Sequence, residues 1–112
     1  MNWNRLKWSP SEKKIARSAY DAALEAALAK IMTEFKSKAD AATTPYEMWE
    51  IEDYLHHERP EIDELFDYRY SQLPFVFARL IRVGYLDENR LGGLSDEKRD
   101  IIRSFFSFGA RN

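Results

Sequence analysis

The stretch Arg17–Asp40, which reads RSAYDAALEAALAKIMTEFKSKAD, decides the fold. It is rich in alanine and holds neither glycine nor proline, so its helix propensity is high throughout. Its larger apolar side chains recur at steps of three and four residues, at Tyr20, Leu24, Leu28, Ile31 and Phe35. Such steps place these side chains on one face of a helix. The stretch therefore predicts one long amphipathic helix that runs from about Pro10 to about Asp40.

Two helix-start signals flank this stretch. In the first, Ser9 stands at the N-cap, Pro10 at the first helical position, and Glu12 completes a capping box. The second, Thr44-Pro45-Tyr46-Glu47, repeats the same arrangement. The chain therefore predicts two consecutive helices joined by a short link.

Proline and glycine divide the rest of the chain. Pro60 is expected to break or kink the second helix, because proline disfavours helical geometry at the residue before it. A third helix is expected from Glu61 to about Val83, bent at Pro74 and ended by Gly84.

A last helix is expected after a short turn at 87–91 and a glycine loop at 92–93, with Ser95 as its N-cap. Its apolar side is formed by Ile101, Ile102, Phe105 and Phe106, and Phe108 is left unassigned. The predicted fold is all-α, with two long antiparallel helices that form a dimerisation region and a small C-terminal helical head. Within one domain, the expected segments are a flexible N-terminus at 1–8, a helical hairpin at 9–59, a head at 60–108 and a frayed tail at 109–112.

Composition excludes several classes of protein. The 112 residues include no cysteine, which excludes disulfides and thiolate metal sites. The nearly balanced charge, 17 Lys+Arg against 19 Asp+Glu, argues against nucleic-acid binding, for which a net basic surface is typical. No apolar run is long enough to span a membrane, and the N-terminus lacks the apolar segment of a signal peptide. We therefore expect a cytoplasmic protein with no transmembrane segment and no nucleic-acid partner.

The unequal lengths of the first two helices predict a homodimer. Up to Pro60 the second helix is about half as long as the first, so antiparallel pairing leaves part of the first helix's apolar face uncovered. Exposed apolar surface of that kind is unfavourable, and a second copy of the chain would cover it. The expected interface residues are Leu24, Leu28, Ile31, Met48 and Ile51.

The outer face of the second helix is a candidate binding site. Trp49 and Asp53 are four residues apart and lie side by side, and His56 and Arg59 follow on the same helix. Tryptophan and arginine dominate the energetics of protein interfaces, so this face is typical of an interface hot spot. The alternative is that Trp49 packs against the other helix or the dimer partner, and the residues alone leave both interpretations open.

A metal site is the competing interpretation of the same helix. Glu52 and His56 are four residues apart, and Asp53 and Glu58 add further acid–base groups. No second strong ligand pair accompanies them, and HExxH, GxSxG and phosphate-binding glycine motifs are absent. We interpret these side chains as a solvated polar face and expect neither catalysis nor a cofactor.

Aromatic residues are dense between Phe66 and Phe77. The preferred interpretation is a core whose tyrosines have satisfied polar tips, with Asp67 and Arg69 pairing with each other or with tyrosine hydroxyls. Phe75 is the exception, because it lies off the apolar stripe and is a candidate for recognition.

A specific pattern runs from Met48 to Ile81, MWEIEDYLHHERPEIDELFDYRYSQLPFVFARLI. It holds a Trp, an Asp four residues later, an Arg six beyond that, then E-I-D, D-Y-R-Y-S and F-V-F-A blocks. These elements are Trp49, Asp53, Arg59 and residues 61–63, 67–71 and 75–78. The pattern resembles that of the fluorescence recovery protein family of cyanobacteria. A weaker resemblance extends to Trp8-Ser9 with Glu12 and to Gly93-Leu94 with Glu97-Lys98.

The resemblance implies an α-helical homodimer without catalytic activity or a cofactor of its own. Members of the family bind the photoactivated orange carotenoid protein, mainly through its C-terminal domain. They speed its return to the dark-adapted form and help it leave the phycobilisome, which ends photoprotective quenching. By this resemblance, and with the polar neighbours on the second helix, the expected partner-binding residues are Trp49, Glu52, Asp53, His56, Arg59, Phe75 and Lys98.

Three positions depart from the family pattern. Glu52 stands where many members carry histidine, which reverses the charge available there, and Pro60 and Pro74 replace residues with higher helix propensity. The departures indicate a distant branch of the family. The alternative function is a homodimeric interaction module of the same fold with a different signalling or stress partner, in a bacterium that lacks the carotenoid protein. In a cyanobacterium, peripheral association with thylakoid membranes is expected.

Overall fold

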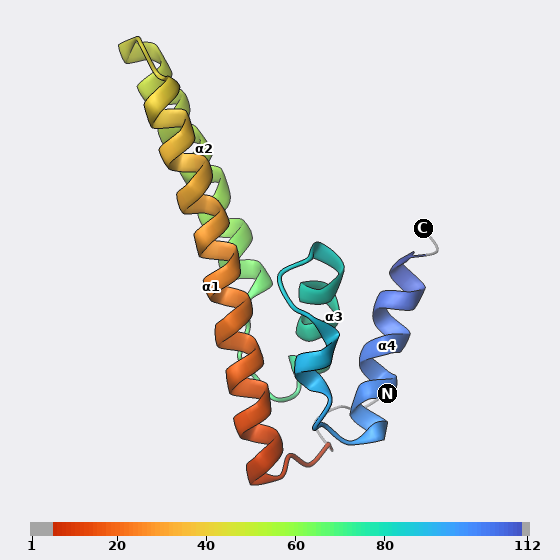
Figure 1. Cartoon of the computed structure of the whole chain (residues 1–112). Coiled ribbons are helices and arrows are strands. Elements are labelled where there is room, and N and C mark those ends of the chain that lie inside the picture. The colour runs from red at the N-terminus through yellow and green to blue at the C-terminus, as the bar shows by residue number, and fades with distance from the viewer. Residues whose placement is uncertain (1–5, 111–112) are drawn as a thin grey trace.

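The computed structural model describes residues 6–110, with side chains through residue 105. Its elements in chain order are α1 (Pro10–Ala41), α2 (Pro45–Leu65), α3 (Leu73–Val83), the 3₁₀ helix η2 (Glu88–Leu91) and α4 (Asp96–Ala110). The described residues form no strand, so the fold is all-α, as predicted. Figure 1 shows α1 and α2 side by side as a long hairpin, with α3 and α4 gathered beside the N-terminal half of α1. The molecule is elongated and measures 54 × 31 × 22 Å.

The first two helices begin at the predicted residues. The Ser9 hydroxyl accepts a hydrogen bond from the backbone N–H of Glu12 at 3.1 Å, and the Glu12 carboxylate accepts one from the Ser9 N–H at 3.0 Å. This reciprocal pair is the predicted capping box. Thr44 caps α2 by accepting a hydrogen bond from the Glu47 N–H at 3.3 Å.

Of the break or kink predicted at Pro60, the break is wrong, because α2 continues through Pro60 to Leu65. Proline at this position removes one backbone donor, and the site is exposed, so water can reach the carbonyl of His56 that loses its partner. Beyond the proline, Ile62 is half-buried and Leu65 is buried. Burial of these side chains stabilises the last turns of the helix, and the hairpin therefore extends past residue 59.

The predicted third helix from Glu61 to Val83 is also wrong. Residues 66–72 form a loop, and α3 starts only at Leu73. Pro74 lies in the first turn of α3, where the backbone N–H that it lacks would have no partner within the helix. At the other end, Gly84 caps α3 with a positive φ of 90°, as predicted.

The core lies in the head, where α3 packs against α4, while η2 packs against α1. Its largest fully buried side chains are Phe77, Leu73, Leu80, Leu91 and Ile102. α1 meets this core with Tyr20 and with three small side chains, Ala16, Ala19 and Ala23, each at most 1% exposed. Small side chains let the head come close to α1, and a Cβ at Gly93 would lie only 2.3 Å from Ile15 Cδ1.

The two ends of the described chain differ from their predicted state. Trp8, expected in a flexible segment, packs against the core with its ring centre 5.4 Å from that of Tyr70. α4 continues to Ala110, past the residue at which a frayed tail is predicted. Residues 1–5 and 111–112, and the side chains of Phe106 and Phe108, lie outside the described part of the chain.

Candidate functional site

The side chains predicted on the outer face of α2 are exposed together. Trp49 is 58% exposed, although tryptophan is usually among the most buried residues of a small domain. Glu52, Asp53, His56 and Arg59 are exposed as well. Within residues 6–110 none of these five side chains makes a hydrogen bond or an ion pair. These five residues, termed here the α2 surface, are therefore free to contact a partner.

The opposite side of α2 is held against α1. The Tyr54 hydroxyl donates a hydrogen bond to the Glu34 carboxylate, and the Lys38 ammonium lies 5.0 Å from the centre of the tyrosine ring. Burial raises the pKa of Tyr54, and the bond to Glu34 raises it further, so the phenol remains a donor. This contact turns Asp53, the preceding residue, away from α1. It joins residues 20 positions apart, so the sequence pattern does not reveal it.

The charge of α2 is strongly one-sided. Arg59 is its only arginine, and it has no lysine. Against this one positive charge it carries carboxylates at Glu47, Glu50, Glu52, Asp53, Glu58, Glu61, Asp63 and Glu64. The summed field of such a helix steers a basic surface toward it and repels an acidic one.

In the described part of α2, the candidate metal ligands do not converge on a common point. Glu52 and His56 are exposed neighbours, and His57 lies 3.7 Å from Glu58 and 4.0 Å from Glu61. In the part of the chain that the structure describes, no group of three or more such side chains could hold a metal ion.

A groove between α1 and α2 holds most of the residues predicted at a dimer interface. Its volume is about 420 Å³. Its apolar wall is made by Leu24, Leu28, Ile31, Leu55 and Ile62. Arg59 and Asp63 line it too, so Arg59 belongs both to this groove and to the α2 surface. The α1–α2 groove is thus continuous with the candidate binding surface.

Two of the predicted interface residues lie outside this groove. Met48 is 54% exposed near the N-terminal end of α2. Ile51 is half-buried and lines a separate depression together with Lys38 and Glu50.

The two head residues predicted to bind a partner have different surroundings. Phe75 is 39% exposed, and its ring lies 5.6 Å from the Arg79 guanidinium and 5.6 Å from the Phe105 ring. Lys98 is only 5% exposed, and its ammonium pairs with the Glu12 carboxylate at 3.2 Å. Phe75 is therefore accessible to a partner. Lys98 is buried in an ion pair within the chain, contrary to the expectation that it contacts a partner.

The aromatic block around residues 66–70 belongs to the core. Tyr20 of α1 meets Phe66 and Tyr68 edge to face, with ring centres 5.4 and 4.8 Å apart. Burial raises the pKa of Tyr68 to about 12, and the contact with Tyr70 adds to this rise. Asp67 and Arg69 form an ion pair with each other, one of the two predicted arrangements. The cluster fixes the loop 66–72 on α1 and so positions the head relative to the hairpin.

Among the described residues, every helix is too short or too polar to cross a membrane.

Comparison with known proteins identifies the family. The profile of the family described as "Photoprotection regulator fluorescence recovery protein" matches residues 8–105. The fluorescence recovery protein of Synechocystis sp. strain PCC 6803 is 29% identical over 97 residues, which are 87% of this chain and 89% of that protein.

Solved structures agree with this relationship. The fluorescence recovery protein of Fremyella diplosiphon superposes with a TM-score of 0.83 at 34% identity, covering 90% of this chain and 98% of that one. The Synechocystis structure gives a TM-score of 0.85 at 28% identity, over 95% of this chain and 100% of the other. The family profile spans both the α2 surface and the head. This chain therefore belongs to the fluorescence recovery protein family, which regulates photoprotection.

Proposed function

We propose that this chain is a non-catalytic regulator that binds the photoactivated orange carotenoid protein, mainly through that partner's C-terminal domain. In this role it accelerates the partner's return to the dark-adapted form and helps it leave the phycobilisome, which ends quenching. The function places the protein in the cytoplasm, at the surface of the thylakoid membranes. The observation that carries the proposal is the solvated Trp49 beside Asp53, with Arg59 on the same helix, in a member of this family.

The chemistry required of the protein is binding alone. A partner that relaxes between two conformations is accelerated by a surface that binds the transition state of relaxation more tightly than the active form. The α2 surface suits this task because it sits on a helix that the Tyr54–Glu34 contact holds in one rotation. The carotenoid belongs to the partner, so no reactive group on this chain is needed.

We further propose that the protein acts as a homodimer through the α1–α2 groove. Leu28 is 49% exposed and Met32 is 53% exposed in the single chain, an unfavourable state for two large apolar side chains. In a two-fold interface both copies present the same patch, so Arg59 and Asp63 at the groove offer opposite charges to each other across the axis. Because Arg59 also belongs to the α2 surface, dimerisation and partner binding are expected to be linked.

The decisive experiment measures the dark relaxation rate of light-activated orange carotenoid protein with and without this chain. We expect acceleration by the wild type and a clear loss with Trp49→Leu or Arg59→Leu. Arg82→Leu is the matched control for Arg59→Leu, because Arg82 is an exposed arginine on α3 outside the α2 surface. Circular dichroism and sedimentation test whether each variant is helical and dimeric, and this test matters most for Arg59→Leu because Arg59 also lines the α1–α2 groove. A folded, dimeric wild type that leaves the rate unchanged would overturn the proposal.

One observation favours a second candidate function. Glu52 is exposed in the middle of the α2 surface, where it adds a negative charge in place of the histidine expected from the family pattern. The same surface would then serve a different signalling or stress partner. Glu52→His separates the two functions: if it creates an acceleration that the wild type lacks, this chain has changed its partner.

A further inference from the structure

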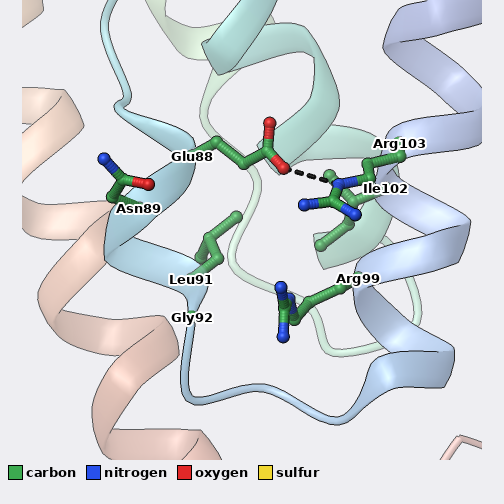
Figure 2. Close-up of a pocket in the computed structure, with 7 residues that line it drawn as sticks. All are labelled: Glu88, Asn89, Leu91, Gly92, Arg99, Ile102 and Arg103. Carbon is green, nitrogen blue, oxygen red and sulfur yellow. Dashed lines mark hydrogen bonds and ion pairs between the residues drawn. The ribbon is translucent and has the colours of Figure 1, made fainter.

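A small pocket lies between η2 and α4, outside the α2 surface and the α1–α2 groove. Its volume is about 80 Å³. Leu91 and Ile102 form its floor and are 2% and 1% exposed. Figure 2 shows Arg99 and Arg103, one helical turn apart on α4, with both guanidinium groups turned toward η2. The pocket thus combines two arginines with an apolar floor.

One carboxylate already uses this pocket. Glu88 of η2 accepts a hydrogen bond from Arg103 Nε at 2.6 Å, the contact drawn in Figure 2. Arg99 has a weaker partner in Asp96, at 3.6 Å, because the Asp96 side chain is 96% exposed and its charge is screened by water. Asp100 is a further exposed carboxylate near Arg103. Glu88 therefore offsets one of the two guanidinium charges, and Arg99 retains most of its capacity to bind an anion.

The geometry indicates both the chemistry and the size of the ligand. A guanidinium group presents a planar fork of N–H donors that fits a carboxylate, and an apolar floor strengthens such charge-assisted bonds. A cavity needs roughly 10–15 Å³ for each water molecule, whereas pockets for small-molecule ligands are usually about 300 Å³ or larger. A space of about 80 Å³ holds a carboxylate with its adjoining methylene groups but not a whole metabolite.

We propose that the η2–α4 pocket receives an aspartate or glutamate side chain of a protein partner, with Arg99 and Arg103 as its two donors. The inference rests on the proposed function in one respect, because that function requires a protein partner. Glu88 is then a built-in competitor for Arg103, and the incoming carboxylate displaces it or binds beside it. This competition predicts that loss of the Glu88 charge strengthens binding, which a purely structural role of the two arginines would not predict.

The first test uses acetyl-glutamate N-methylamide, an analogue of an acidic side chain, and follows the Nε–H resonances of Arg99 and Arg103 by NMR. We expect saturable shifts of both resonances. Arg99→Leu or Arg103→Leu should weaken binding at least about tenfold, the loss that corresponds to one hydrogen bond to a charged group. Glu88→Gln should strengthen it about threefold, as expected for removal of one partly exposed ion pair. Arg90→Leu is the matched control, because Arg90 is an exposed arginine of η2 that does not line the pocket.

Two free anions complete this test. Chloride at equal ionic strength should not reproduce the shifts, and inorganic phosphate should not bind more tightly than the glutamate analogue. A site that takes phosphate but not the analogue, or shifts that do not saturate, would overturn the proposal.

The second test uses the whole partner. If the wild type accelerates relaxation of the orange carotenoid protein, the double variant Arg99→Leu/Arg103→Leu should accelerate it less, while Arg90→Leu should match the wild type. Equal acceleration by the double variant would overturn the assignment of this pocket to the partner. If the wild type does not accelerate relaxation while the analogue still binds, the proposed function fails and the carboxylate site stands.

Discussion

Glu12 at the start of α1 and Lys98 at the start of α4 form an ion pair that joins the two ends of the fold. The Lys98 ammonium lies 3.2 Å from both carboxylate oxygens of Glu12, and the two residues are 86 positions apart in the chain. The same carboxylate accepts hydrogen bonds from the backbone N–H groups of Ser9 and Ser95, so it caps both helices. Lys98 also donates to the Lys7 carbonyl at 2.6 Å. One carboxylate thus ties the N-terminal segment, α1 and α4 together.

Glu12→Gln is expected to destabilise the protein by about 3 kcal/mol, because it leaves a nearly buried ammonium without its counter-charge. Lys98→Met should cost less, since the Glu12 carboxylate keeps its two backbone donors. Urea denaturation followed by circular dichroism measures both free energies of unfolding. Asp21→Asn is the control: Asp21 pairs with Arg17 on the same helix, but both side chains are more than half exposed, so the change should be at most about 0.5 kcal/mol. Equal effects of Glu12→Gln and Asp21→Asn would contradict this account.

The same carboxylate predicts a dependence of stability on pH. The Ser9 N–H, followed by the Ser95 N–H and Lys98, holds the pKa of Glu12 below its ordinary value of 4.5, against the opposing effect of burial. A carboxyl whose pKa is lower in the folded state stabilises the fold above its unfolded pKa, and this contribution is lost as the pH falls through the folded value. The difference in unfolding free energy between wild type and Glu12→Gln should therefore be constant near neutral pH and shrink below about pH 4.5. If the difference in unfolding free energy grows as the pH falls, the pKa of Glu12 is raised rather than lowered in the folded state.

Capping signals in the sequence predict three helix starts and one helix end correctly, whereas the helix boundaries predicted at Pro60 and Glu61 are wrong. Ser9, Thr44 and Ser95 cap helices, and Gly84 ends one, because each of these effects depends on residues within one helical turn. Helical periodicity also places Trp49 away from the apolar stripe of α2, but it leaves open whether the side chain packs elsewhere; in the single chain Trp49 is exposed.

The errors arise where distant contacts outweigh local preference. Pro60 weakens the helix locally, but burial of Leu65 in the core keeps α2 intact beyond it. Alanines make up most of the buried face of α1, beside Glu12 and Tyr20. Alanine is only weakly hydrophobic, so this face is harder to recognise in the sequence than the stripe of larger residues at Leu24 and Leu28. The burial of Lys98 depends on its ion pair with Glu12, and patterns of local sequence do not predict an ion pair between residues so far apart in the chain.

Three prolines of α2 and α3 provide a test of this account, because the same change to alanine should have three different effects. Pro60→Ala restores a backbone donor in the interior of α2 and should stabilise the protein by about 1–3 kcal/mol. Pro74→Ala should destabilise by about 1–2 kcal/mol, because Pro74 is almost fully buried and its ring carbons would leave a cavity. Pro45→Ala is the control: Pro45 is exposed in the first turn of α2, and the change should stay within about 0.5 kcal/mol. Thermal unfolding of the three variants measures these differences, and a destabilising Pro60→Ala would mean that Pro60 has a role that its exposure does not show.

The α1–α2 groove makes a prediction about assembly. Leu28 lines the groove and is half exposed in the single chain, so Leu28→Glu would place a charge inside an interface between two copies. A buried charge without a partner costs several kcal/mol, enough to dissociate a dimer at micromolar concentration. Sedimentation equilibrium should therefore show a dimer for the wild type and a helical monomer for Leu28→Glu.

The matched control is Ala29→Glu, which adds the same charge at the next position, where the side chain is exposed and outside the groove. This variant should remain dimeric, because one residue along a helix turns the side chain by about 100°. If both variants remain dimeric, the interface lies elsewhere on the molecule. If Leu28→Glu dissociates the dimer and also abolishes acceleration of the carotenoid protein while Trp49 stays exposed, partner binding requires two copies. Arg59, which lies in both the groove and the α2 surface, then supplies the physical link between assembly and function.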